Sequence, residues 1–123
     1  MFALVNSPLL SICIPTRNRA QFLHTLLESI ARQVTPAVEV VISDDASTDD
    51  TASLIESFRP RLPRLTYEKV DPAFRYDRNL LHAVALARGE FCWLFGDDDR
   101  LEPGGSLRCS ALPWNRAADG AFC

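Results

Sequence analysis

Hydrophobic positions along this chain follow two alternating patterns: short apolar runs, and longer segments whose apolar residues recur at helical spacing. The apolar runs predict buried strands at 9–14, 38–43, 65–70 and 91–95. The helical spacing predicts amphipathic helices at 19–33, 48–58 and 77–88. This alternating order requires right-handed crossovers, so we expect an α/β fold, a mainly parallel sheet with helices on both faces.

The ends of these segments carry residues typical of strand and helix boundaries. Pro15 is expected to end the first strand, and the last run is apolar on both faces, which predicts a central strand. Asn18, Ser47 and Asp77 are the expected N-caps of the three helices, because their side chains can accept hydrogen bonds from free backbone N–H groups. Gly89 is the residue expected just past the third helix.

The pattern changes near residue 107. Residues 1–107 contain all the predicted strands and helices, whereas 108–123 have no clear periodicity. We therefore expect an irregular tail at 108–123, either a loose end or non-native sequence that follows a change of reading frame.

Composition narrows the class of protein. The chain has 123 residues and a formal net charge of −3, which argues against nucleic-acid binding, since that usually needs a basic surface. No two cysteines form a Cys-x-x-Cys pair, so free reduced thiols are expected rather than zinc ligands or disulfides. The cysteines are Cys13, Cys92, Cys109 and Cys123. Because neither a signal-peptide pattern nor an apolar run of ~20 residues occurs, we expect a cytoplasmic protein, and peripheral contact with the inner face of a membrane stays open.

Three adjacent carboxylates, Asp97, Asp98 and Asp99, directly follow the last predicted strand. They repel one another unless a positive charge compensates, and hard divalent cations do this while bridging carboxylate to phosphate. A solvated acidic turn would explain the same residues. Their place at a strand end favours a site, because ligands of such sheets bind beyond the carboxyl ends of the strands.

Other polar clusters follow the remaining predicted strands. Asp44 and Asp45 follow the second, where a carboxylate can accept hydrogen bonds from a base or a ribose, although acids also favour a helix N-terminus. Arg17 or Arg19, after the first, could balance phosphate charge. After the third strand, Arg75 could do the same and Tyr76 could stack on a base. Each cluster alone is also explained by a turn or a helix start, but together they fall at successive strand ends.

These residues resemble the family 2 glycosyltransferases, which have a GT-A fold. The matching segments are 11–19, 41–51, 87–91 and 93–99, and the resemblance covers roughly 9–107. Segment 76–79 and the Trp-Leu-Phe-Gly-Asp-Asp-Asp ending are most similar to abequosyltransferase-like members, which build bacterial surface glycans. The resemblance implies a Rossmann-like half that binds a nucleoside-diphosphate sugar and transfer to a glycan or lipid-linked acceptor.

The resemblance also implies roles for individual residues. Pro15 and Thr16 would line the base pocket, and Asp44 or Asp45 would contact the base. Asp97 would approach the ribose. The implied donor site comprises Pro15, Thr16, Arg17, Asn18, Asp44, Asp45, Arg75, Asn79, Asp97 and Asp98. The implied ligands of Mg²⁺ or Mn²⁺ are Asp97, Asp98 and Asp99.

One departure from the family limits the expected activity. The acceptor-binding half and the catalytic base of the family lie well beyond the metal motif, and the residues after Asp99 supply no credible base. We therefore expect the donor-binding part of a transferase, with a truncated, non-catalytic remnant as the alternative. A receiver-type phosphorylation domain is disfavoured, because the only lysine is Lys69 and the first strand leads to no acidic pair. Apolar surface made for a missing half would make the isolated chain poorly soluble.

Overall fold

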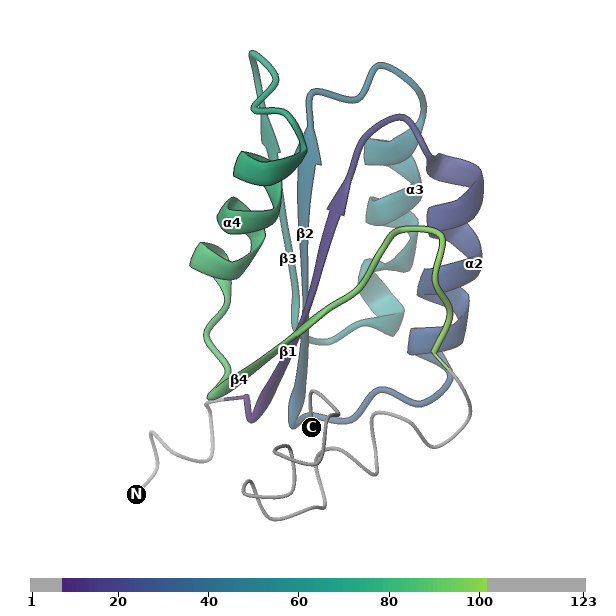
Figure 1. Cartoon of the computed structure of the whole chain (residues 1–123). Helices are drawn as coiled ribbons and strands as arrows, with labels where there is room; N and C mark the ends of the chain where they lie inside the picture. The colour runs from purple at the N-terminus through teal and green to yellow at the C-terminus, as the bar shows by residue number, and fades with distance from the viewer. Residues whose placement is uncertain (1–7, 102–123) are drawn as a thin grey trace.

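The computed structural model describes residues 8–101, which form a four-stranded sheet flanked by helices. The strands are β1 (Leu10–Thr16), β2 (Val38–Asp45), β3 (Leu65–Val70) and β4 (Phe91–Leu94). The helices are α2 (Ala20–Ala31), α3 (Thr51–Phe58), the 3-10 helix η1 (Arg59–Arg61) and α4 (Tyr76–Leu86). The strand order is β3-β2-β1-β4 with every neighbouring pair parallel. Helices α2 and α3 cover one face and α4 the other (Figure 1), which confirms the predicted fold class.

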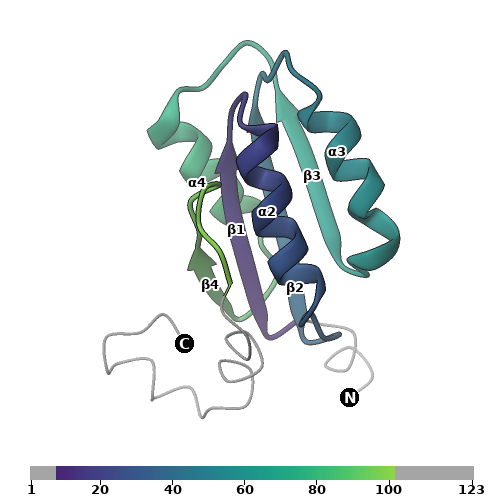
Figure 2. The same cartoon turned by 90° about the vertical axis from the view of Figure 1, so that its right-hand side faces the viewer.

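Two apolar cores hold these layers together. The larger lies between the sheet and the α2–α3 face, where Ile12, Leu26 and Ile55 are fully buried. The smaller lies under α4 and includes Cys13 and Ala83. Successive strand residues point to opposite faces, so β1 and β2 feed both cores and are buried along their whole length. Figure 2 shows α2 and α3 side by side over the sheet.

Strand β1 continues through Pro15, where we expected it to end. Alternate residues of a strand direct their backbone groups to the same side, and Cys13 accepts a hydrogen bond from Phe95 N–H on the β4 side. Strand β4 ends at Leu94, opposite Cys13. The nitrogen of Pro15 therefore points beyond the end of β4, where no ladder donor is needed. The same extension makes Asp44 and Asp45 the last residues of β2 rather than a turn.

The predicted helix caps were wrong. The N-cap positions are Arg19, Asp50 and Arg75, and none of them forms a side-chain cap hydrogen bond. Asn18 and Ser47 bind each other's loops instead, as described below. Asp77 lies inside the first turn of α4.

Strand β4 is an edge strand of the sheet formed by residues 8–101, not the central strand we expected. Its apolar residues are only partly buried, and Leu94 is 39% exposed. Gly89, two residues past the C-cap Ala87, serves the approach to β4 rather than the end of α4. A Cβ at Gly89 would lie 2.6 Å from Ser11 Oγ and 2.9 Å from Ser11 N, so the chain passes β1 too closely for any side chain.

A buried polar network fixes that passage. Ser11 Oγ donates to Glu39 Oε2 at 2.6 Å and accepts from Gly89 N–H at 2.8 Å, while Arg88 N–H donates to the same Glu39 oxygen at 2.7 Å. Glu39 is buried on β2, so its carboxylate joins β1, β2 and the entry to β4. Buried polar groups of this kind cost stability unless they are hydrogen-bonded, and these are.

The expected tail at 108–123, with Cys109 and Cys123, lies outside the described residues. Within the described ones, Cys13 and Cys92 are free thiols, as predicted. No helix in this part of the chain combines the length and the apolar character that crossing a membrane requires.

Candidate functional site

The carboxyl ends of β1 and β2 bring two of the predicted clusters together. The parallel register places Pro15 opposite Ser43 and Thr16 opposite Asp44. Because side chains alternate between the faces of a strand, Asp44 and Asp45 point to opposite sides of the sheet. The two adjacent carboxylates therefore bind different partners and stabilise different segments of the chain.

Asp44 is fully buried, and each of its carboxylate oxygens accepts a hydrogen bond from the protein. Its Oδ1 accepts from Ser47 N–H at 3.0 Å, and its Oδ2 accepts from the Tyr67 hydroxyl at 2.7 Å. Burial, and then the hydrogen bond to Asp44, raises the pKa of Tyr67 above its usual range, so the phenol stays protonated and keeps donating. Asp44 thus shapes the loop after β2.

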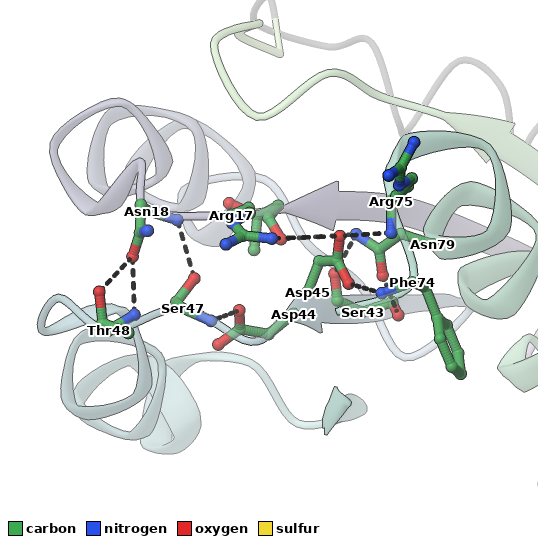
Figure 3. A network of polar contacts seen from close by, with 11 residues as sticks. Arg17, Asn18, Ser43, Asp44, Asp45, Ser47, Thr48, Phe74, Arg75 and Asn79 are labelled. Carbon is green, nitrogen blue, oxygen red and sulfur yellow. Dashed lines mark hydrogen bonds and ion pairs between the residues drawn. The ribbon is translucent and has the colours of Figure 1, made fainter. Parts of the chain in front are cut away.

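Asp45 points the other way and holds the segment that leads into α4. Its carboxylate accepts hydrogen bonds from Phe74 N–H and, at 2.9 Å, from Arg75 N–H. Arg75 has a φ of 74°, in the left-handed region that residues with a side chain rarely adopt, and this pair of bonds holds it there. Arg17 Nη1 lies 4.0 Å from Asp45 Oδ2. Figure 3 marks this ion pair with a dashed line.

Asn18 and Ser47 tie the loops after β1 and β2 to each other (Figure 3). Asn18 N–H donates to Ser47 Oγ at 2.8 Å, and Asn18 Oδ1 accepts from Thr48 N–H at 2.7 Å and from Asp49 N–H at 3.2 Å. Asn18 has a φ of 51°, which asparagine tolerates better than most residues. The side chains of Asn18 and Ser47 therefore hold the loop after β1 against the loop after β2.

Asn79 joins α4 to the ends of β1 and β2. Its Nδ2 donates to Ser43 O at 3.1 Å and to Thr16 O at 3.4 Å, and its Oδ1 accepts from Ser43 Oγ at 2.6 Å. The side chain is buried, and every polar atom of its amide has a protein partner. The hydrogen bonds of Asn79 therefore hold the backbone at the ends of β1 and β2 in place.

The acidic run after β4 closes the site. Thr16 Oγ1 donates to Asp97 Oδ2 at 2.9 Å, which connects β1 to this run across the sheet. Arg19 contacts two carboxylates, with Nε 3.2 Å from Asp97 Oδ1 and Nη2 3.3 Å from Asp98 Oδ2. Asp99 accepts from Gly96 N–H at 3.0 Å and so closes a turn.

Asp97 is a partly buried carboxyl group of this run, and its pKa is shifted. Burial raises its pKa above the usual range, against the opposing effects of the Thr16 hydrogen bond and the Arg19 charge. A cation beside Asp97 would offset this cost of burial, because a nearby opposite charge favours the ionised form.

These groups surround a cavity of about 380 Å³ at the carboxyl ends of β1, β2 and β4. Eight of the predicted site residues line it: Pro15, Thr16, Arg17, Asp45, Arg75, Asn79, Asp97 and Asp98. Arg19, Tyr76 and Gly96 line it as well. Asn18, Asp44 and Asp99 do not line it and bond to the surrounding loops instead.

The sequence offered Arg19 only as an alternative to Arg17 for balancing phosphate charge, and the structure places both arginines at the cavity. Nothing in the sequence pattern marks Tyr67 as the partner of Asp44, because the two residues belong to different strands. Their contact follows only from the pairing of β2 with β3, which puts Tyr67 opposite Ile42.

The oxygens of Asp97 and Asp98 fit a hard divalent cation. Both carboxylates already converge on one cation, the Arg19 guanidinium, and oxygen ligands are those that Mg²⁺ and Mn²⁺ prefer. Among residues 8–101, no group of three or more acidic, histidine or cysteine side chains is arranged to hold a metal alone. Such a cation would need further oxygens, which a diphosphate supplies.

Comparison with known proteins identifies the family. A family model described as "Glycosyl transferase family 2" matches residues 11–119. The chain belongs to glycosyl transferase family 2. It is 43% identical over 96 residues to abequosyltransferase RfbV of Salmonella typhimurium, covering 76% of this chain and 29% of that protein. It is 50% identical over 83 residues to validoxylamine A glucosyltransferase of Streptomyces hygroscopicus, covering 66% of this chain and 18% of that protein.

Two solved structures share the fold of this chain. S. aureus TarS 1-349 in complex with UDP superposes with a TM-score of 0.76 at 30% identity, over 84% of this chain and 31% of that one. Mannosyltransferase PcManGT from Pyrobaculum calidifontis, in complex with GDP-Man and Mn²⁺, gives a TM-score of 0.72 at 26% identity, over 87% of this chain and 33% of that one. The resemblance to the GT-A fold is thus confirmed, and this chain spans about a third or less of each of these proteins.

Proposed function

We propose that this chain is the donor-binding part of a glycosyltransferase that takes a sugar from a nucleoside-diphosphate sugar. The observation that carries the proposal is the cavity at the carboxyl ends of the strands, which is lined by both carboxylates and arginines: Asp45, Asp97, Asp98, Arg17, Arg19 and Arg75. Asp97 and Asp98 would hold Mg²⁺ or Mn²⁺, while Arg17 and Arg75 face an anion in the cavity. TarS and PcManGT, whose structures contain UDP and GDP-Man with Mn²⁺, support this choice of ligand.

Different residues of the cavity would bind the base, the ribose and the diphosphate of the donor. The exposed ring of Tyr76 and the backbone of Pro15 offer surfaces for a base, and Asp45, whose carboxylate accepts from Arg75 N–H, lines the same cavity. The Thr16 hydroxyl donates to Asp97 Oδ2 and would thereby orient that carboxylate toward the ribose and the diphosphate. When bound, the divalent cation would stabilise the charge that develops on the leaving nucleoside diphosphate.

The acceptor is proposed to be a glycan or a lipid-linked sugar in the synthesis of a bacterial surface polysaccharide. This follows the named activities of the relatives, among them abequosyltransferase RfbV and the GalNAc(5)-diNAcBac-PP-undecaprenol beta-1,3-glucosyltransferase of Campylobacter jejuni. A lipid-linked acceptor would bring the protein to the inner face of the membrane as a peripheral partner. We assign the catalytic base to none of the described residues.

Calorimetric titration tests the donor site. The full chain is titrated with uridine, guanosine, cytidine and thymidine diphosphates, each with and without Mn²⁺. We expect at least one to bind, and Mn²⁺ to strengthen that binding by about tenfold or more, as coupled ligands do. Asp98→Asn should abolish the effect of Mn²⁺. Asp50→Asn is the matched control, because Asp50 is an exposed N-cap whose side chain makes no cap hydrogen bond.

A well-folded sample that binds none of these nucleotides in the presence of Mn²⁺ would refute the donor site and favour a non-catalytic remnant. Sugar transfer by this chain alone, with a nucleotide sugar and a lipid-linked acceptor, would show that a base lies within it after all.

A further inference from the structure

Arg19 holds both carboxylates that the proposed function gives to a divalent cation. Its Nε lies 3.2 Å from Asp97 Oδ1, and its Nη2 lies 3.3 Å from Asp98 Oδ2. The guanidinium also stacks over the Phe22 ring, with its central carbon 4.8 Å from the ring centroid. The planar fork of one arginine thus bridges two acidic side chains, which a lysine ammonium does less well.

Arg19 and a divalent cation cannot both hold these oxygens. Two positive groups at the same pair of carboxylates repel each other strongly at contact distance. Arg19 must therefore leave Asp97 or Asp98 before a metal is fully ligated. Its side chain is free to do so, since it is 43% exposed and rises from the residue that precedes α2.

The cavity offers a second place for the released guanidinium. Arg19 lines it together with Arg17 and Arg75, so it needs only to turn within the same cavity to meet an anion there. A diphosphate is the anion of the proposed donor, and a guanidinium binds phosphate oxygens in pairs.

We propose that Arg19 is an exchangeable counter-ion that couples metal binding to donor binding. It neutralises Asp97 and Asp98 while the site is empty, and it passes to the diphosphate when a divalent cation takes the carboxylates. This inference rests on the proposed function and adds to it a residue that makes the two ligands cooperative. Metal alone binds weakly because it must displace Arg19, and metal with nucleoside diphosphate binds well because the diphosphate receives Arg19.

The test compares the full chain with its Arg19→Gln variant in two titrations. Mn²⁺ binding without nucleotide is followed by electron paramagnetic resonance of free Mn²⁺. We expect Arg19→Gln to bind Mn²⁺ tighter by roughly three- to tenfold, because an exposed ion pair no longer competes. In saturating Mn²⁺, the tightest-binding diphosphate of the panel above should bind Arg19→Gln weaker by roughly the same factor.

Two further variants separate this role from a general loss of charge. Arg32→Gln removes the same charge at the far end of α2, about 20 Å along the helix, and should change neither affinity. Arg19→Lys keeps the charge without the fork and should lie between the wild type and Arg19→Gln in both titrations. Thermal unfolding of each variant shows that it is folded.

The outcomes distinguish this inference from the proposed function. If the wild type binds Mn²⁺ and nucleotide, but Arg19→Gln leaves Mn²⁺ affinity unchanged or weakens it, the exchange role of Arg19 is overturned and the donor site stands. If the wild type binds neither ligand, both are overturned.

Discussion

At the residue scale, Asp97 shows a conflict between stability and binding. Burial raises its pKa, so its ionised form is less stable in the folded chain than in the unfolded chain. Asp97→Asn removes that cost while the amide oxygen can still accept from Thr16 Oγ1. We expect the free energy of unfolding at neutral pH to rise, and Mn²⁺ binding to be lost. Chemical denaturation and calorimetry measure the two effects.

The pH dependence follows with the same sign. A carboxyl whose pKa is raised in the folded state favours folding more as the pH falls through that raised pKa. Wild-type stability should therefore gain, relative to Asp97→Asn, as the pH is lowered from neutral, while Mn²⁺ affinity should fall over the same window. A loss of stability in Asp97→Asn at neutral pH would mean that the Arg19 ion pair outweighs the cost of burial.

Replacing Asn79 should lower the stability of the fold, unlike replacing Asp97, because the buried amide of Asn79 has a hydrogen-bond partner for each of its polar atoms. Asn79→Ala leaves Ser43 Oγ and the carbonyls of Thr16 and Ser43 without their partner. We expect a loss of about 2–3 kcal/mol in the free energy of unfolding. Leu81→Ala, at a 67% exposed position of the same helix, is the control and should change it by less than about 0.5 kcal/mol. Equal effects would show that Asn79 is no special anchor.

At the element scale, the entry to β4 depends on close contact of two backbones. A Cβ at Gly89 would lie 2.9 Å from Ser11 N, a backbone atom that cannot move aside without shifting β1. Gly89→Ala should therefore cost about 2 kcal/mol or more, in the range of other strained substitutions. Gly96→Ala is the matched control, because its Cβ would meet only side-chain atoms of Asp98 and Asp99 at 3.2 Å. Thermal unfolding of both variants tests this, and a smaller loss for Gly89→Ala would contradict it.

The elements themselves were largely predictable, and their side-chain partners were not. Periodicity located the four strands and the three α-helices of residues 8–101, because apolar residues must face the sheet or its covering helices. It did not indicate the short 3-10 helix η1. Boundaries failed where tertiary contacts decide them: Pro15 stays in β1 because β4 ends beside it. Asn18 and Ser47 are residue types that favour the N-cap position, yet each forms hydrogen bonds with the loop of the other. Of two adjacent aspartates, only the strand pleat shows that Asp45, not Asp44, reaches the cavity.

At the scale of the whole molecule, the exposed edge of β4 is a surface prone to association. Within 8–101 no strand pairs with its outer side, and its Leu94 is 39% exposed. An unpaired apolar edge is a template for pairing with another chain. We expect sedimentation velocity to show self-association that Leu94→Glu reduces. Leu81→Glu, the same change on the more exposed α4 surface, should have a weaker effect, and a monodisperse wild-type monomer would contradict the prediction.

The hydrogen bond between Thr16 and Asp97 joins residues 81 positions apart, across the pair formed by the first and last described strands. Contacts between residues so distant in sequence form slowly, because the whole intervening loop must close first. Strands β1, β2 and β3 can pair while the chain is still being synthesised, but the acidic run reaches its place only when β4 docks. In a refolding experiment, metal-dependent nucleotide binding should therefore recover last, after the helices have formed. Its recovery would report when β4 docks onto the sheet.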